Sequence, residues 1–112
     1  MGRKIVHAKV QGTVQRVMFR QTVIRAMIKR DIVGGATNLR ENRDQVEMTL
    51  DGDENVINEF LATLQATKPL NDWGAQVNKL TIMSTGREVN AHQVTTSNVD
   101  NRDWNPNVKF YI

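Results

Sequence analysis

Apolar and polar residues alternate along several stretches of the chain, as they do in β-strands that bury one face. Residues 4–11 show this pattern, with valine and alanine on one face and mainly polar side chains on the other. The alternation over residues 76–83 slips by one near Asn78, which predicts a bulge or an early turn there. Two further predicted strands, over residues 32–39 and 45–50, are separated by a short polar turn and therefore predict a hairpin.

Two stretches carry apolar residues at the spacing of an amphipathic helix. The first spans residues 20–30, where Met27 is expected to fill the core. The second ends near Ala66, with Asp53 as a suitable N-cap before it and Pro69 closing it. Because each pattern has a single apolar stripe, both helices should pack one face against a sheet.

The predicted order of elements is strand, helix, strand, strand, helix, strand, with a further short strand over residues 108–112. Split βαβ units in this order build an antiparallel sheet with two helices on one face, which is an α+β fold. After the second helix, Trp73 is expected to be buried as a lid over a helix end. The polar residues 84–107 predict a long loop, an extended hairpin or an interaction surface, and no role is assigned to His92 or Trp104 within them.

The composition is that of an ordinary globular protein, and it excludes several kinds of site. The 112 residues are expected to form one domain over 1–112, and we expect a monomer. The chain has no cysteine, which excludes disulfides, thiolate metal sites and cysteine nucleophiles, and which fits a cytoplasmic location. No apolar run approaches the ~20 residues needed to cross a bilayer, so we expect no membrane partner. The net charge of +3 weakly favours anionic ligands but is too small to indicate nucleic acid.

Residues 12–20 join the first predicted strand to the first helix and are the main candidate for chemistry. A chain that leaves a strand and opens a helix directs free backbone N–H groups into the gap, and the helix dipole adds partial positive charge. Arg20 adds a planar, permanent cation that suits phosphate or carboxylate. These features favour an oxyanion cradle, and the alternative is a plain connecting loop with a solvated arginine. His7, on the more polar face of the first strand, is interpreted as a sheet-surface histidine.

A motif of six residues at fixed spacing lies in this segment, namely Gly12, Val14, Gln15, Val17, Phe19 and Arg20. The motif resembles the signature of the acylphosphatases, G-x-V-Q-G-V-x-F-R. A second element of that family, G-W-V-x-N, places its asparagine eighteen residues after the arginine, and Asn38 stands eighteen residues after Arg20 here. The resemblance covers most of residues 4–83 and the final strand.

This resemblance implies hydrolysis of the carboxyl-phosphate bond of acyl phosphates, without metal or cofactor, on a ferredoxin-like fold. That fold is a two-layer βαββαβ sandwich. The partners implied are a small-molecule acyl phosphate and inorganic phosphate as product or inhibitor. By the resemblance, Arg20 holds the phosphate together with backbone N–H groups of a phosphate-binding loop, and Asn38 orients the attacking water. The loop residues are Gln15, Arg16, Val17, Met18, Phe19 and Arg20.

Three features depart from the family pattern. Arg16 stands at the second glycine of the signature, and if that glycine has positive φ, an arginine there costs roughly 1 kcal/mol or more, or the loop path changes. Alternatively, Arg16 is a solvated surface residue, or it adds a second cation to the cradle. Gly35 stands where the family has tryptophan, and the tail after Ile82 is long. These departures motivate a second hypothesis, a non-catalytic acylphosphatase-like domain that binds an anion or a partner.

A third hypothesis is a single-stranded RNA binder, because RNA-recognition domains share a similar order of elements. Such domains stack bases on aromatic side chains of the sheet. Here the first predicted strand offers Ile5, His7 and Lys9, and the third offers Val46 and Met48. Since neither strand has an aromatic platform, we expect no nucleic-acid partner.

Overall fold

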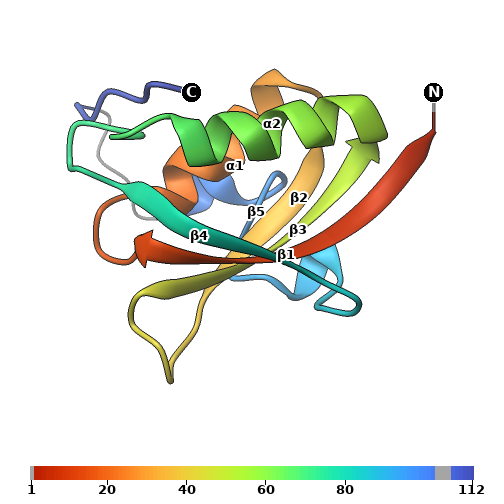
Figure 1. Ribbon diagram of the computed structural model, residues 1–112, viewed down its shortest axis with the longest axis horizontal. Helices are drawn as coiled ribbons and strands as arrows, with labels where there is room; N and C mark the ends of the chain where they lie inside the picture. The colour runs from red at the N-terminus through yellow and green to blue at the C-terminus, as the bar shows by residue number, and fades with distance from the viewer. Residues whose placement is uncertain (1, 103–106) are drawn as a thin grey trace.

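The computed structural model describes residues 2–102 and 107–112 and has a five-stranded sheet with two α-helices. The strand order is β4-β1-β3-β2-β5, and every neighbouring pair is antiparallel. Both helices lie on the same face of the sheet (Figure 1), which confirms the predicted α+β, ferredoxin-like fold. The elements are β1 (Arg3–Thr13), α1 (Phe19–Lys29), β2 (Val33–Asn38), β3 (Gln45–Asp53), α2 (Glu54–Ala66), β4 (Gln76–Met83), β5 (Val94–Thr95) and the short 3-10 helices η1 (Val89–Ala91) and η2 (Val99–Asn101).

Strand β1 lies between β3 and β4 and has the alternation that the sequence predicted. Its inward-facing side chains at positions 6, 8 and 10 are buried. Along β4 the pairing skips Asn78 between Gln11 and Gly12 of β1, so Asn78 is the extra residue of a bulge, as expected. A Cβ atom at Gly12 would lie 2.4 Å from the carbonyl oxygen of Gln76, so only glycine allows the two backbones to approach this closely.

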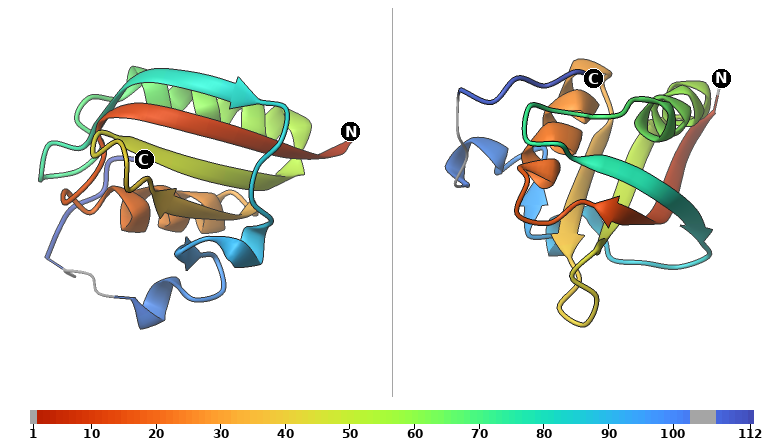
Figure 2. Two further views of the ribbon diagram at one scale, coloured as in Figure 1. Left: turned by 90° about the horizontal axis from the view of Figure 1, so that it is seen from below. Right: turned by 60° about the vertical axis from the view of Figure 1, so that its left-hand side comes forward.

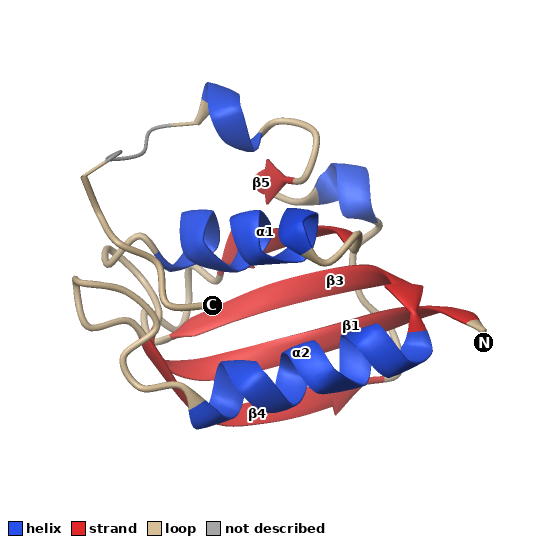
Figure 3. Ribbon diagram, turned by 90° about the horizontal axis from the view of Figure 1, so that it is seen from above, coloured by secondary structure: helices blue, strands red, loops and turns tan. Residues whose placement is uncertain are grey.

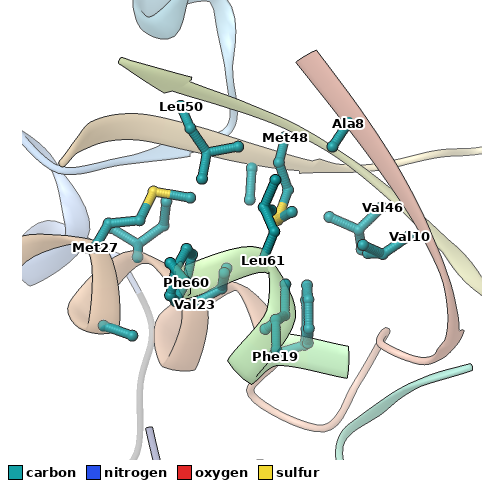
Figure 4. Close-up of a cluster of buried hydrophobic side chains, with 14 of the residues drawn as sticks. Ala8, Val10, Phe19, Val23, Met27, Val46, Met48, Leu50, Phe60 and Leu61 are labelled. Carbon is teal, nitrogen blue, oxygen red and sulfur yellow. The ribbon is translucent and has the colours of Figure 1, made fainter. Parts of the chain in front are cut away.

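The core fills the space between the sheet and the two helices (Figure 4). Phe19 and Met27 of α1 and Phe60 of α2 are at most 1% exposed, which confirms the core role predicted for Met27. Helix α1 packs beside β2, and α2 packs against β4 and β3 (Figure 3). The predicted N-cap of α2 is also confirmed, because the Asp53 carboxylate accepts hydrogen bonds from two backbone N–H groups of the first turn.

Two predictions for the later part of the chain are wrong. Trp73 is 47% exposed and is therefore not the buried lid that was expected. Residues 108–112 form no strand, because Phe110 makes only a single bridge with Asn71. Residues 108–112 lie against the loop that follows α2, which contains Trp73. The tryptophan side chain stays partly exposed to solvent beside this contact. Trp104 lies outside the described residues.

The polar residues after β4 cross from that edge of the sheet to the opposite edge, next to β2. Strand β5 pairs with β2 through two residue pairs, Gly35 with Thr95 and Ala36 with Val94. Figure 2 shows β5 beside β2, with η1 and η2 on either side of it along the chain. Among the residues that the structure describes, no helix is long and apolar enough to cross a membrane. The return of this segment brings residues 92–102 next to the turn between β1 and α1.

Candidate anion-binding site

The turn between β1 and α1 has an unusual backbone. Arg16 and Met18 both have positive φ, 67° and 59°, whereas Gln15 and Val17 do not. Backbone that alternates in this way directs successive N–H groups toward one side and forms a concavity for an anion. Arg16 therefore occupies the left-handed conformation that was considered for its position, at a cost of about 1–2 kcal/mol. Met18 is the N-cap of α1 and makes no side-chain cap, so no cap side chain occupies the first N–H groups of the helix.

Gln15 fixes one side of this turn. The two N–H donors of its side-chain Nε2 are shared among three carbonyl oxygens of the β2–β3 hairpin, those of Leu39 at 3.1 Å, Asn42 at 3.0 Å and Gln45 at 2.7 Å. The side chain of Gln15 thus points to the hairpin and not into the concavity. The part in phosphate binding that the sequence predicted for Gln15 therefore rests on its backbone N–H, and it stays a prediction.

Asn71, which the sequence patterns did not single out, fixes the other side. Its side chain is fully buried, and Nδ2 donates to the Val17 carbonyl and to Thr22 Oγ1, each at 2.8 Å. Its Oδ1 accepts from the N–H groups of Trp73 and Ala75. Every hydrogen-bonding position of this amide is therefore used to join the loop after α2 to the turn and to α1.

A pocket of about 490 Å³ opens in front of the turn. Arg16, Arg20 and Arg102 line it, and no carboxylate does so among the described residues. Burial, and secondarily the charge of Arg102, lower the pKa of Arg20. The guanidinium is thus charged in a place that disfavours positive charge, and a bound anion would relieve this. Of the six predicted loop residues, four line the pocket, namely Arg16, Met18, Phe19 and Arg20, whereas Gln15 and Val17 do not.

Arg20 and Asn38, the two predicted catalytic residues, meet at the same atom. Arg20 Nη1 donates to Gln93 Oε1 at 2.8 Å, and the backbone N–H of Asn38 donates to that oxygen at 3.0 Å. Asn38 itself lines a second pocket of about 340 Å³, and Gln93 lines both pockets. The side-chain Oδ1 of Asn38 is buried and accepts no hydrogen bond from the part of the chain that the structure describes.

His92, next to Gln93, is buried between two threonines of the sheet. Its Nδ1 lies 2.9 Å from Thr37 Oγ1, and its Nε2 lies 2.7 Å from Thr49 Oγ1. Burial is the main reason why the pKa of His92 falls to about 4. A Cβ atom at Gly35 would lie 2.5 Å from His92 Cβ. Gly35, where the family motif has tryptophan, therefore leaves the space that His92 fills.

Within the described residues, no cluster of three His, Asp or Glu side chains is arranged to hold a metal. What the site offers is a set of hydrogen-bond donors and positive charges around a concavity at the start of a helix. Such a set binds a phosphate or a carboxylate and stabilises the negative charge that develops in a transition state. Sequence patterns did not find Gln93 or Arg102, because both come from the polar tail, where no motif marks them.

Comparisons with known proteins show which solved structures share this fold. The structure resembles an acylphosphatase from Bacillus subtilis, with a TM-score of 0.60 and 25% identity over 79% of this chain and 90% of that one. It also resembles an acylphosphatase from Coxiella burnetii, with a TM-score of 0.61 and 24% identity over 77% and 84% of the two chains. Full-length HypF in its phosphate- and nucleotide-bound form matches at a TM-score of 0.56 and 19% identity, over 83% of this chain and 12% of that one.

No curated protein sequence gives a significant match. The family model described as acylphosphatase matches residues 6–101, which include both motifs, the turn and the first part of the tail. Because that match spans most of the chain and the fold agrees with it, this protein belongs to the acylphosphatase family.

Proposed function

We propose that this chain hydrolyses the carboxyl-phosphate bond of acyl phosphates to a carboxylate and inorganic phosphate. Membership of the family supports a hydrolase. The observation that carries the proposal is the convergence of the Arg20 guanidinium and the Asn38 backbone N–H on one oxygen, that of Gln93, beside a pocket with three arginines. This contact brings Arg20 and the end of β2 to one place, where the guanidinium donors that Gln93 does not use suit the oxygens of a transferring phosphoryl group.

Arg20 and the turn hold the phosphate in this proposal. The guanidinium has five N–H donors, and only one of its nitrogens is engaged by Gln93, so donors remain for phosphate oxygens. Backbone N–H groups of residues 15–20 complete the cradle, with the dipole of α1 behind them. Phosphoryl transfer depends mainly on positioning and charge stabilisation, which these groups supply without a nucleophilic side chain.

Asn38 orients the attacking water. Its buried Oδ1 is an acceptor without a donor in the described chain, so a water that donates one hydrogen to it would have a fixed orientation. The water oxygen forms a bond to phosphorus, and the bond from phosphorus to the carboxyl oxygen breaks. Its electron pair leaves with the carboxylate, while an oxygen of the phosphate accepts the proton of the water. The carboxylate is a good leaving group, so no general acid from the protein is needed.

Hydrolysis of benzoyl phosphate with a chelator present tests this proposal. We expect turnover by the parent chain, nearly complete loss in Arg20→Ala, and a loss of about 10²- to 10³-fold in Asn38→Ala, the scale of one positioned transition-state donor. Arg3→Ala is the matched control, because Arg3 is exposed and paired with Asp51 at the other end of β1. Normal turnover by Arg20→Ala would defeat the proposal.

A second candidate is a non-catalytic domain that binds an anion. It is favoured by Arg16, a non-glycine residue with left-handed backbone at the position where the family signature has glycine, and by Gly35, which stands where the family has tryptophan. If this candidate is correct, the parent chain binds phosphate but does not hydrolyse benzoyl phosphate. Recovery of turnover in Arg16→Gly would show that the turn, and not the rest of the site, had suppressed the reaction.

A further inference from the structure

Gln93 connects the two residues to which the proposed function assigns the chemistry. Its Oε1 is the acceptor for both Arg20 Nη1 and the Asn38 N–H. We propose that Gln93 is a positioning residue, which holds the Arg20 guanidinium against the end of β2 in the orientation that binds the anion. The inference rests on the proposed function, because the anion site is the same one.

The backbone of Gln93 is firmly held, so that its side chain has a fixed base. Its N–H donates to Thr37 Oγ1 at 3.0 Å, and the next residue, Val94, pairs with Ala36 of β2. The preceding residue, His92, is 5% exposed and lies between two threonines in the space that Gly35 leaves. The glycine and the histidine together let the tail approach β2 closely enough for Gln93 to reach both partners.

The hydrogen bonds around His92 are consistent with one neutral form. Thr49 Oγ1 lies 2.6 Å from the Arg87 carbonyl and donates to it, so it accepts from His92 Nε2–H and also from His7 Nδ1, which lies 3.1 Å away. Nδ1 then accepts from the hydroxyl of Thr37, whose oxygen accepts the N–H of Gln93. Each proton has one place in this chain, and the chain ends at the backbone of the proposed positioning residue.

An amide suits this position better than a carboxylate or an apolar side chain. An arginine side chain that has no partner samples many rotamers. A hydrogen bond from Arg20 to a fixed acceptor restricts these rotamers before the anion binds, so anion binding costs less side-chain entropy. A neutral oxygen provides that bond without cancelling the positive charge of Arg20. The Nε2 group of Gln93 makes no hydrogen bond with any described residue, so both of its N–H donors are available to the anion.

Titration with inorganic phosphate, followed by ¹⁵N NMR of arginine side chains and of the turn amides, tests this role. In Gln93→Ala we expect the Kd for phosphate to rise about fivefold, the scale of one ordinary hydrogen bond. The Arg20 guanidinium signal should lose the restricted rotation that it shows in the parent. Gln93→Glu should keep that restriction and yet weaken phosphate binding further, because its carboxylate neutralises the guanidinium. Gln65→Ala on α2 is the matched control, since Gln65 bonds only its own helix.

Two results would overturn the positioning role. If Gln93→Ala binds phosphate more tightly than the parent, Gln93 competes with the anion, and if binding matches that of Gln65→Ala, Gln93 is a bystander. Hydrolysis of benzoyl phosphate by the same proteins separates this outcome from failure of the proposed function. Turnover that depends on Arg20 but not on Gln93 defeats only the positioning role. A parent that binds phosphate through Gln93 but shows no turnover defeats only the proposed hydrolysis, and a parent that binds no phosphate defeats both.

Discussion

Acidification from pH 7 to pH 4 should destabilise the fold through His92. This side chain is buried between Thr37 and Thr49, and its neutral form has one donor and one acceptor in use. Protonation of Nδ1 removes the acceptor for the Thr37 hydroxyl and places a charge in a nearly dry site. The groups that face the imidazole only partly offset each other, because Glu47 favours the charged form whereas Arg87 and His7 disfavour it.

The size of the effect follows from the pKa of His92, which is about 4 in the fold against 6.5 ordinarily. Between these two values the unfolded chain binds the proton and the folded chain does not, so stability falls as the pH falls. Above pH 6.5 both states are neutral and nothing is lost. Since one pKa unit corresponds to about 1.4 kcal/mol, the loss from this residue approaches about 3 kcal/mol at pH 4.

Urea denaturation of the parent and of His92→Gln at several pH values between 7 and 4 measures this effect. All other titrating groups are common to both proteins and cancel in the difference between their free energies of unfolding. As the pH is lowered from 7 to 4, the free energy of unfolding of the parent should fall by about 3 kcal/mol more than that of His92→Gln. A difference that stays constant across this range would refute the reasoning, because His92 would then titrate alike in both states.

Two further substitutions test how the tail and the turn are built. Gly35→Ala should destabilise the fold by about 1–3 kcal/mol and speed amide exchange in β5, because its Cβ would overlap His92; urea denaturation and hydrogen exchange measure this, and unchanged exchange would contradict it. Arg16→Gly should raise the free energy of unfolding by up to about 1 kcal/mol, because relief of the left-handed backbone exceeds the extra entropy of glycine in the unfolded chain. A drop in stability measured by urea denaturation would show that the Arg16 side chain contributes more than its backbone costs.

The features that the sequence predicted correctly depend on neighbours in the chain or on a regular period. The bulge at Asn78 is visible as a slip in alternation, and the cap at Asp53 needs only the first turn of α2. Arg20 lies at the predicted start of the first helix and Asn38 in the predicted hairpin, whereas their catalytic roles stay a prediction. Each of these is decided within one element or at its boundary, where local patterns are informative.

The features that the sequence did not predict depend on contacts between distant residues. Gln93 lies 73 residues after Arg20 and 55 after Asn38, and no period or motif links them. Trp73 was expected to be buried because of its size, but the buried position beside it is taken by Asn71, whose amide joins three segments. In the sequence, the contact between the tail and β2 was indicated only by Gly35. This glycine could be understood only once His92 was seen to fill the space beside it.

The pairing between β2 and β5 also covers one edge of the sheet. Beyond its full pairing with β3, β2 has an outer edge whose polar backbone groups are occupied only by the tail, at Gly34, Gly35, Ala36 and Asn38. If the tail lifts, that edge becomes a free template for strands of other molecules. Acid that charges His92 should therefore promote self-association before the rest of the sheet unfolds.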